Sequence, residues 1–454
     1  MPKTNSKYLT MTLDEKHAFI EKLLSDNEEL KTKNAKLVEE LERLKKPKKT
    51  SKNSSLPPAQ TEKGNIKKKS KKVSKAHGQG GRKLSEVYDE RIVAKAKKCV
   101  GCSHEFSESE QKLTAVYDRI SIPEIKPYIR RIERYAGVCP HCAEATKAPV
   151  PVGMEEGSPF DSSVRAMALY YRYINFVSYE RLKMMFADIF KLDISEGALA
   201  NLFRQSKEDV SPDVECILHR LRQSRLVASD ETSARVSGKN QWEWVFQNED
   251  VCLHVIRPSR GADVISEVMQ GHRPDIWVSD LFSSQKTHPA KAWQACLAHQ
   301  LRDCQYAIDA GDSRFARRMK NIFFRAFVIH SKRHTLTEET QARYRHNLFK
   351  RLEQCLDIEA DSKEGKRLKN RYLKIKDNLF LFLEDSTIPP TNNSSEQAIR
   401  MSKVFRKVTN CFRSDWGRDL FANMRSIINT GKRQGLSPFE AINAALDPKH
   451  VLLH

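Results

Sequence analysis

The sequence has no long apolar run. No stretch of its 454 residues approaches the roughly 18 consecutive apolar residues that a membrane-spanning helix requires. Residues 1–12 also lack the apolar core of a secretory signal. We therefore expect a cytoplasmic protein, nucleoid-associated if bacterial, without a membrane partner. In that compartment its ten cysteines would stay thiols or metal ligands.

Acidic residues are scarce relative to basic ones. Lys and Arg number 79 against 58 Asp and Glu, which gives a formal net charge of +21. Such a surplus predicts a polyanionic partner, and the lack of any membrane-spanning run favours nucleic acid over a lipid surface. The length suggests about three domains.

Residues 1–45 carry a leucine heptad. One seam position holds leucine throughout, and the other holds leucine and isoleucine interrupted by Asn27 and Asn34. The leucines of the first seam are Leu23, Leu30, Leu37 and Leu44. Buried asparagines in such a seam are typical of a parallel two-stranded coiled coil, which predicts a homodimer or higher oligomer. A lone amphipathic surface helix is the alternative.

Residues 46–84 have almost no apolar side chains. Twelve lysines lie between positions 45 and 75. We expect a disordered basic linker that contacts DNA phosphates without reading bases, or else a merely solvating spacer.

Two C-x-x-C pairs follow within residues 85–150. Their four thiolates could hold one structural, tetrahedral Zn²⁺. These cysteines are Cys99, Cys102, Cys139 and Cys142. Residues 116–122 and 128–135 are predicted strands that would bring the pairs together. Unrelated buried thiols or a redox pair are the alternatives, and His104 and His141 could substitute as ligands.

Residues 158–222 show helical spacing of apolar residues. The stretch from Ser195 to Ala198 resembles the entry to the recognition helix of a helix-turn-helix, which would contact DNA. A helical bundle that supports the next domain is the alternative interpretation.

Three acids stand at the ends of predicted elements. Asp230 closes a buried strand that begins at Leu226, Asp280 follows an apolar stretch from 276, and Glu396 opens a helix. Together they could hold the two Mg²⁺ (or Mn²⁺) ions of phosphodiester chemistry, and would be catalytic. Singly, each aspartate could be a turn residue, and Glu396 could be the capping partner of Asn393.

The acids belong to a predicted mixed sheet domain at 223–435. Strands at 241–247 and 251–256 and a helix at 262–269 lie between the first two acids. The order strand, strand, strand, helix, strand indicates an α/β sheet with a helical insertion at about 290–385. Residues 436–454 form a C-terminal tail.

Basic residues lie beside two of the acids. Within the insertion, His299 could donate a hydrogen bond to the scissile phosphate, with Arg302 contacting DNA, or His299 could simply pack in a helix. Cys296 and His299 alone make a poor metal site. After Glu396, four cations are expected to contact DNA, three of them on its helix face: Arg400, Lys403, Arg406 and Lys407. A solvated charged face is the alternative.

These features together resemble the insertion-sequence-66 family of transposases. The resemblance spans nearly the whole chain, and its most specific part is the motif Asn-Asn-Ser-Ser-Glu-Gln-Ala-Ile-Arg at 392–400. The chain departs from the pattern where Leu281 and Phe282 replace Gly-Tyr and where Gln397 replaces a common arginine. These changes leave the three acids intact.

The resemblance implies an α+β multidomain protein with an N-terminal coiled coil, a zinc-ribbon-like module, a helical region and a ribonuclease H-like DDE catalytic domain. It implies metal-dependent cleavage and strand transfer at the inverted-repeat ends of a mobile element, into target DNA, with element-encoded helper proteins as candidate partners. It transfers the catalytic triad to Asp230, Asp280 and Glu396. A structure-specific nuclease or resolvase, and a non-catalytic DNA-binding descendant, are the alternatives.

Overall fold

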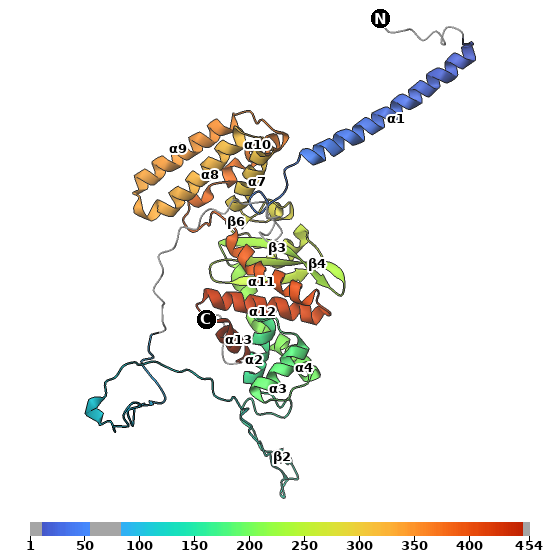
Figure 1. Cartoon of the computed structure of the whole chain (residues 1–454). Helices are drawn as coiled ribbons and strands as arrows, with labels where there is room; N and C mark the ends of the chain where they lie inside the picture. The colour runs from blue at the N-terminus through green and yellow to red at the C-terminus, as the bar shows by residue number, and fades with distance from the viewer. Residues whose placement is uncertain (1–10, 55–82, 448–454) are drawn as a thin grey trace. The chain divides into compact units, whose positions relative to one another are not determined.

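A computed structural model describes residues 11–54 and 83–447 of the chain (Figure 1). The described residues divide into two compact units, one of 11–54, 132–183 and 195–447 and the other of 83–131 and 184–194. Within the described ranges, no helix is long and apolar enough to cross a membrane.

The α-helices and strands follow one another in this order: α1 (Leu13–Lys45), β1 (Ala136–Val138), β2 (Ala145–Lys147), α2 (Ser162–Tyr173), α3 (Tyr179–Phe190), α4 (Glu196–Asp209), α5 (Ser211–Arg222), β3 (Leu226–Val236), β4 (Lys239–Gln247), β5 (Cys252–Arg257), α6 (Ala262–Met269), β6 (Ile276–Ser279), β7 (Ala292–Ala295), α7 (Leu297–Asp309), α8 (Phe315–Lys332), α9 (Glu338–Leu356), α10 (Lys363–Ile375), α11 (Asn393–Thr409), α12 (Asp415–Arg433) and α13 (Pro438–Leu446).

The central feature is a five-stranded mixed sheet with the strand order β5-β4-β3-β6-β7. Strands β5, β4 and β3 are antiparallel neighbours, whereas β6 and β7 run parallel to β3. The predicted order of strand, strand, strand, helix, strand is confirmed by β3, β4, β5, α6 and β6. One boundary was wrong, because β3 continues to Val236 and Asp230 therefore lies inside the strand.

Helix α12 covers the outer edge of the sheet. Edge strand β5 would otherwise leave backbone groups unpaired, which invites pairing with another chain. The Oγ atoms of Ser426 and Thr430, one helical turn apart, accept hydrogen bonds from the backbone N–H groups of His254 and Cys252 at 2.8 and 3.0 Å. This spacing of hydroxyls on α12 closes the edge over those residues.

Helix α11 packs on the face of the sheet that carries Asp230. Because side chains alternate along a strand, Val245, the partner of Asp230 in the β3–β4 register, lies on the same face. Val245, Cys252, Ala398 and Ile399 form one buried cluster between the sheet and α11. The apolar pair at 398–399 thereby fixes the start of α11 against β4 and β5.

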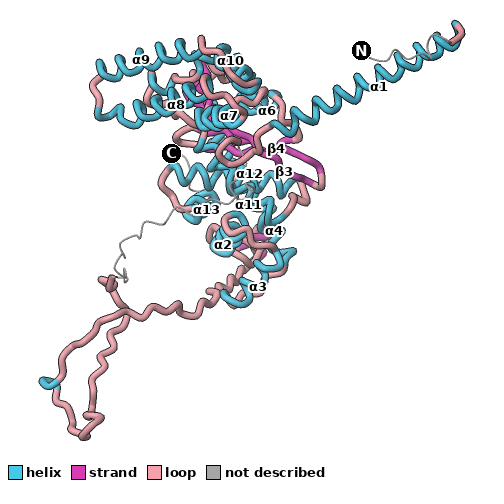
Figure 2. Tube along the Cα trace, turned by 45° about the horizontal axis from the view of Figure 1, so that its top comes forward, coloured by secondary structure: helices cyan, strands magenta, loops and turns pink. Residues whose placement is uncertain are grey.

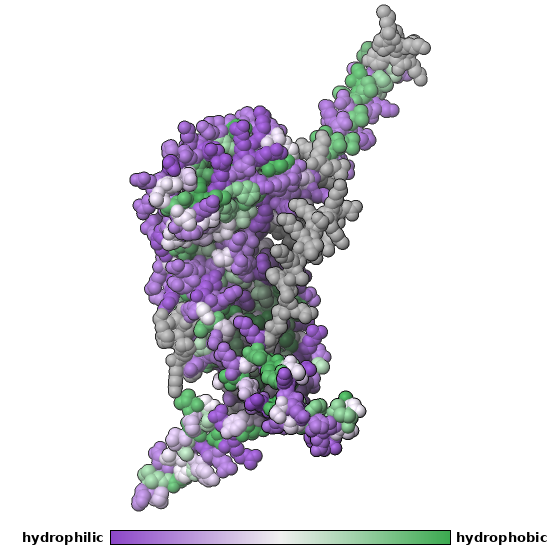
Figure 3. Space-filling model, turned by 60° about the vertical axis from the view of Figure 1, so that its left-hand side comes forward, coloured by the Kyte–Doolittle hydropathy of each residue, from purple (hydrophilic) through white to green (hydrophobic). Residues whose placement is uncertain are grey.

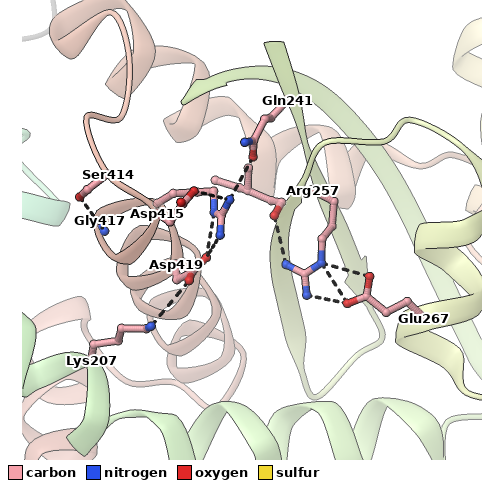
Figure 4. Close-up of polar contacts among 10 residues, drawn as sticks. Lys207, Gln241, Arg257, Glu267, Ser414, Asp415, Gly417 and Asp419 are labelled. Atoms are coloured by element: carbon pink, nitrogen blue, oxygen red, sulfur yellow. Dashed lines mark hydrogen bonds and ion pairs between the residues drawn. The ribbon is translucent and has the colours of Figure 1, made fainter. Parts of the chain in front are cut away.

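Polar contacts join α12 to α4 and to the sheet, and Figure 4 labels Lys207, Gln241, Asp415 and Asp419 among the residues involved. Arg418 of α12 makes several of these contacts. Its guanidinium contacts Asp419 and Asp415 at 2.8 Å each and donates to Gln241 on β4 at 3.3 Å. Asp419 also pairs with Lys207 of α4 at 3.6 Å. Arg418 therefore serves the packing between α4, α12 and the sheet.

Four helices, α7 to α10, lie in the predicted insertion between β7 and α11 (Figure 1). Their shared core is aromatic: Phe323 contacts Tyr372 edge-on with ring centroids 5.6 Å apart and lies 6.0 Å from Phe380. The last of these helices, α10, ends at Ile375, and short 3₁₀ turns follow it within the predicted insertion.

The N-terminal heptad forms one continuous helix, α1. Its leucines between Leu13 and Leu41 are solvent-exposed in the single chain, and Figure 3 shows hydrophobic side chains among hydrophilic ones along this helix. Leu23, Leu30 and Leu37 are each more than half exposed. Burial of this stripe needs a partner helix, and the coiled coil stays a prediction.

The expected linker begins with an ordered turn, which the composition did not predict. Asn53 is buried at 4% exposure and donates to Asp309 at the end of α7 over 2.8 Å. Its Oδ1 accepts from the Thr50 N–H at 2.7 Å. The remainder of the linker, residues 55–82, lies outside the described residues.

Residues 83–135 are almost entirely loop (Figure 2). The predicted strands at 116–122 and 128–135 are absent from this described stretch. The strands that do form, β1 and β2, have three residues each and make a hairpin around the second C-x-x-C pair. Alternating apolar residues alone suggested strands there, but their side chains stay exposed, with Ile122 and Ile129 more than 80% accessible.

Candidate active site

Asp230 lies in the central strand β3, which is antiparallel to β4 on one side and parallel to β6 on the other. The parallel pairing of β3 with β6 ends at Ala228, and Asp230 follows two residues later while still paired with β4. Burial, then the charges of Glu231, Asp280 and Glu396, raise the pKa of Asp230 to about 8, although the Glu231 N–H donates to its Oδ1 at 2.9 Å. Both other predicted acids therefore lie within electrostatic reach of Asp230.

Asp280 follows directly after the last residue of β6, as predicted. Its Oδ1 accepts a hydrogen bond from the Phe282 N–H at 2.8 Å, which fixes the turn that leaves the strand. Because β6 is the parallel neighbour of β3, this turn emerges beside Asp230. The neighbouring strands thus deliver two carboxylates to one edge of the sheet.

Glu396 lies in the first turn of α11. Its Oε1 accepts a hydrogen bond from Arg302 Nη2 at 3.2 Å and lies 3.6 Å from His299 Nε2. The capping alternative is wrong: the helix begins after Asn392, and Ser395 donates to the Asn392 side chain at 2.6 Å. The carboxylate of Glu396 instead turns towards α7.

Cys296, His299 and Arg302 lie at the start of α7, on the side that faces Glu396 and the loop before it. Cys296 precedes the helix, and its Sγ accepts a hydrogen bond from the Asn392 N–H at 3.1 Å, so it fastens the loop that leads to Glu396. Burial and Arg302 lower the pKa of His299, which Glu396 and Asp280 only partly oppose. His299 is therefore neutral near pH 7, and its buried Nδ1 has no partner in the described structure.

The other polar residues of the 392–400 motif join α11 to the sheet. Asn392 donates from Nδ2 to the Ser229 carbonyl at 2.7 Å, one residue before Asp230. Gln247 on β4 donates to Ser394 and Ser395 at 2.7 and 2.9 Å. The motif therefore positions Glu396 relative to Asp230 through side chains on both flanks.

Sequence reasoning missed a buried network around Glu231, on the opposite face of β3. Glu231 accepts from Arg260 at 2.8 Å and from Gln285 at 2.8 Å. Arg260 also lies over the rings of Phe282 and Trp242, 3.7 and 4.4 Å from their centroids. The network ties the loop after Asp280 to the strand that carries Asp230, and the only sequence signal was an acid directly after Asp230.

The three carboxylates provide oxygen donors of the kind that Mg²⁺ and Mn²⁺ prefer. Among the residues that the structure describes, no group of three or more His, Cys, Asp and Glu side chains is placed so that it could hold a metal ion. Neighbouring acids raise the pKa of Asp230, and a bound divalent cation would relieve that repulsion, so the chemistry of the three carboxylates fits such a cation.

The two C-x-x-C pairs adopt the same turn. The N–H of the residue after each second cysteine donates to the carbonyl of the first at 2.9 Å, and that residue has a positive φ, 61° at Ser103 and 57° at Ala143. Backbone N–H groups inside each turn lower the pKa of the first thiol, those of Gly101 and Cys102 for Cys99, and those of Cys142 and His141 for Cys139. Both turns therefore favour thiolates. The two pairs fall in different compact units.

The predicted DNA-contacting cations divide into two groups. Arg400, Lys403 and Lys407 are exposed on α11, four, seven and eleven residues after Glu396, and so share its side of the helix. Arg406 is half-buried and donates to the Ser233 carbonyl at 2.8 Å. Arg406 therefore secures α11 to β3, a role that its spacing from Glu396 did not suggest.

The helices predicted to resemble a helix-turn-helix are α3 and α4. Ser195 caps α4, and its Oγ accepts from the Ala198 N–H at 3.1 Å. The stretch 184–194, which holds most of α3, belongs to a different compact unit from α4. The recognition-helix interpretation therefore stays a prediction.

Comparison with known proteins agrees with these features. The model of the "Transposase IS66 family" matches residues 157–419, more than half of the chain, and the match includes Asp230, Asp280 and Glu396. A comparison with curated proteins found no match. The family resemblance expected from the sequence is thereby confirmed, and the chain belongs to the IS66 family of transposases.

Proposed function

We propose that this chain is a DNA transposase that uses Asp230, Asp280 and Glu396 for metal-dependent cleavage and strand transfer at the ends of a mobile element. Membership of the transposase family supports the general role. The observation that carries the catalytic assignment is the placement of the acids: Asp280 follows β6, the parallel neighbour of β3, and the loop before Glu396 is tied to Ser229 beside Asp230. The raised pKa of Asp230 agrees with this placement. A buried acid whose pKa is raised beside other carboxylates is typical of functional sites.

The three acids Asp230, Asp280 and Glu396 would hold two Mg²⁺ or Mn²⁺ ions. Bound there, the ions would activate water or a DNA 3′-hydroxyl and stabilise the leaving oxygen. Arg302 orients Glu396 through the 3.2 Å hydrogen bond. The neutral His299 beside it could donate a hydrogen bond to a phosphate oxygen without adding charge.

The remaining parts would serve binding and assembly. Arg400, Lys403 and Lys407 would neutralise backbone phosphates beside the acids. The mixed sheet is compatible with the ribonuclease H-like domain that the family resemblance implies. The proposal has three further parts. Two chains would pair through α1, and the protein would act on chromosomal DNA in the cytoplasm. One structural Zn²⁺ would bind Cys99, Cys102, Cys139 and Cys142.

The test is an assay of cleavage and joining on a duplex that carries the inverted repeats flanking the gene. Asp230→Asn, Asp280→Asn and Glu396→Gln should each abolish Mg²⁺-dependent cleavage and strand transfer while DNA binding persists. Glu249→Gln, an exposed acid in the β4–β5 turn, is the matched control and should retain both activities.

The outcomes separate the alternatives. Cleavage without joining by the unaltered chain would favour a nuclease or resolvase. DNA binding without cleavage would favour a non-catalytic descendant. Retained cleavage in Asp230→Asn would overturn the catalytic assignment.

A further inference from the structure

Helix α10 of the insertion has an extreme excess of positive charge. Over the residues Lys363–Ile375 it carries a single acid, Glu364, and six basic residues. The basic residues are Lys363, Lys366, Arg367, Lys369, Arg371 and Lys374. No part of the proposed function uses this helix.

The charges gather on the outer face of α10. Gly365, Leu368, Tyr372 and Ile375 are buried against the other insertion helices, at the helical spacing expected of a packed face. The positions left for solvent include Lys366, Arg367 and Lys374, which are all exposed. We call these three residues the α10 basic face.

Nearby acids neutralise other cations and leave the α10 basic face positive. Arg371 pairs with Asp303 of α7, and Lys369 with Glu359 at 3.6 Å. Within the described parts of the chain, Lys366, Arg367 and Lys374 have no ion-pair partner. Three uncompensated cations on one helix face repel one another, and an extended polyanion would relieve that repulsion.

Helix α10 lies alongside the helix that supports the candidate active site. The Tyr372 hydroxyl donates to the Gln300 carbonyl of α7 at 3.5 Å, one residue beyond His299. Lys374 follows two residues after Tyr372 and so belongs to the same end of α10. Helix α10 is therefore packed directly on the helix that contacts Glu396.

We propose that the α10 basic face binds the sugar-phosphate backbone of the DNA duplex that runs on from the reacting bond. This inference rests on the proposed transposase function. Lys366 and Lys374 are eight residues apart, about 12 Å along a helix. That length matches about three to four base-pair steps of 3.4 Å, so consecutive phosphates of one strand can meet the face. Cations of this kind contact phosphate oxygens, which position a duplex without reading its bases.

Helix α9 of the same insertion supplies a matched control. Its exposed cations Arg343, Lys350 and Arg351 lie among acids, since Glu338, Glu339 and Glu353 share that helix. Replacing the three by alanine removes the same charge from the same bundle. The two triple variants therefore differ in the face that is changed and not in net charge.

The experiment measures binding of the full-length chain to a duplex of random sequence by fluorescence anisotropy over a range of salt concentrations. For Lys366→Ala/Arg367→Ala/Lys374→Ala, we expect the slope of log affinity against log salt to become shallower by about 2–3, because about 0.9 of slope accompanies each lost phosphate contact. The α9 variant should keep the slope of the unaltered chain. Circular dichroism spectra that match the unaltered chain would show that both variants are folded.

Equal loss in both variants, or no change of slope in the α10 variant, would overturn the inference. The readout is binding and needs no catalysis, so it is independent of the proposed chemistry. A chain that never cleaves DNA but loses salt-dependent affinity only in the α10 variant would contradict the transposase mechanism and support the α10 basic face.

Discussion

Arg302 of α7 donates a hydrogen bond to Glu396 of α11 over 3.2 Å, and these residues lie 94 positions apart in the chain. The contact joins the helical insertion to the helix that carries the third acid. Both side chains are partly shielded from solvent, with exposures of 22% and 35%, which strengthens a charge-assisted contact relative to a fully hydrated one.

Loss of this contact should weaken metal use more than DNA binding. Arg302→Gln leaves Glu396 free to rotate, and loss of an outer-shell partner typically lowers metal affinity or activity about 10–100-fold. Titration of cleavage with Mn²⁺ should show a higher half-saturating concentration. Arg325→Gln, which removes an exposed arginine of α8, serves as the control. An unchanged Mn²⁺ requirement in Arg302→Gln would show that Arg302 does not orient Glu396.

The Glu231 network should contribute to stability. Glu231→Ala would leave Gln285, which is fully buried, and Arg260 without their acceptor. Unsatisfied buried partners cost about 1–3 kcal/mol, so the thermal unfolding midpoint should fall. Glu231→Gln keeps an acceptor for Gln285, so its thermal unfolding midpoint should fall less. Equal midpoints for Glu231→Ala and the unaltered chain would refute the role of the network.

Asp385 should make stability depend on acid pH. Its contact with Arg225, together with Thr387, lowers the pKa of this carboxyl to about 2. Because the folded pKa lies below the unfolded value of about 4, the stabilisation is present above pH 4 and is lost as the pH falls towards 2. Asp385→Asn should therefore lower the urea midpoint at pH 7 and have progressively less effect between pH 4 and 2.

The control for that series is Glu384→Gln, which removes an exposed charge one residue away. Urea unfolding should give this variant the same midpoint as the unaltered chain at pH 7. A pH-independent effect of Asp385→Asn would mean that the substitution acts through packing and not through the charge.

Each C-x-x-C pair should be necessary for zinc. The turns at Cys99 and Cys139 already favour thiolates, and tetrahedral zinc needs four ligands. Elemental analysis of purified protein should find one zinc per chain, and Cys99→Ser/Cys102→Ser or Cys139→Ser/Cys142→Ser should abolish it. Cys216→Ser is the control. Zinc retained after loss of either pair would disprove a shared site.

Local sequence sufficed to find the elements that carry the three acids. Asp280 directly follows an apolar strand and Glu396 lies in the first turn of a helix, so short-range patterns located both. The order of elements along the chain from β3 to β6 was predictable for the same reason, because apolar runs and turn residues marked each strand. Strand β7 was not predicted, because Ala292–Ala295 fell within the expected helical insertion. The extension of β3 to Val236 was not, since its pairing with β4 depends on a partner strand beyond Asp230.

Contacts between distant residues were beyond sequence reasoning. Arg406 seemed another DNA-contacting cation, yet it binds Ser233, 173 positions away. The role of Glu231 depends on its hydrogen bonds with Arg260 and Gln285, which are 29 and 54 positions away. Alternating apolar residues between 116 and 135 predicted strands that do not form, because such a pattern gives a strand only where a partner strand exists.

The most direct test of the account is to locate bound metal. Crystals of the full chain soaked in Mn²⁺ should give two anomalous scattering peaks about 3.5–4 Å apart, bounded by the carboxylates of Asp230, Asp280 and Glu396. Asp230→Asn crystals should lose both peaks. Manganese bound elsewhere, or three acids that remain apart with no metal between them, would contradict the assignment of this site as the catalytic centre.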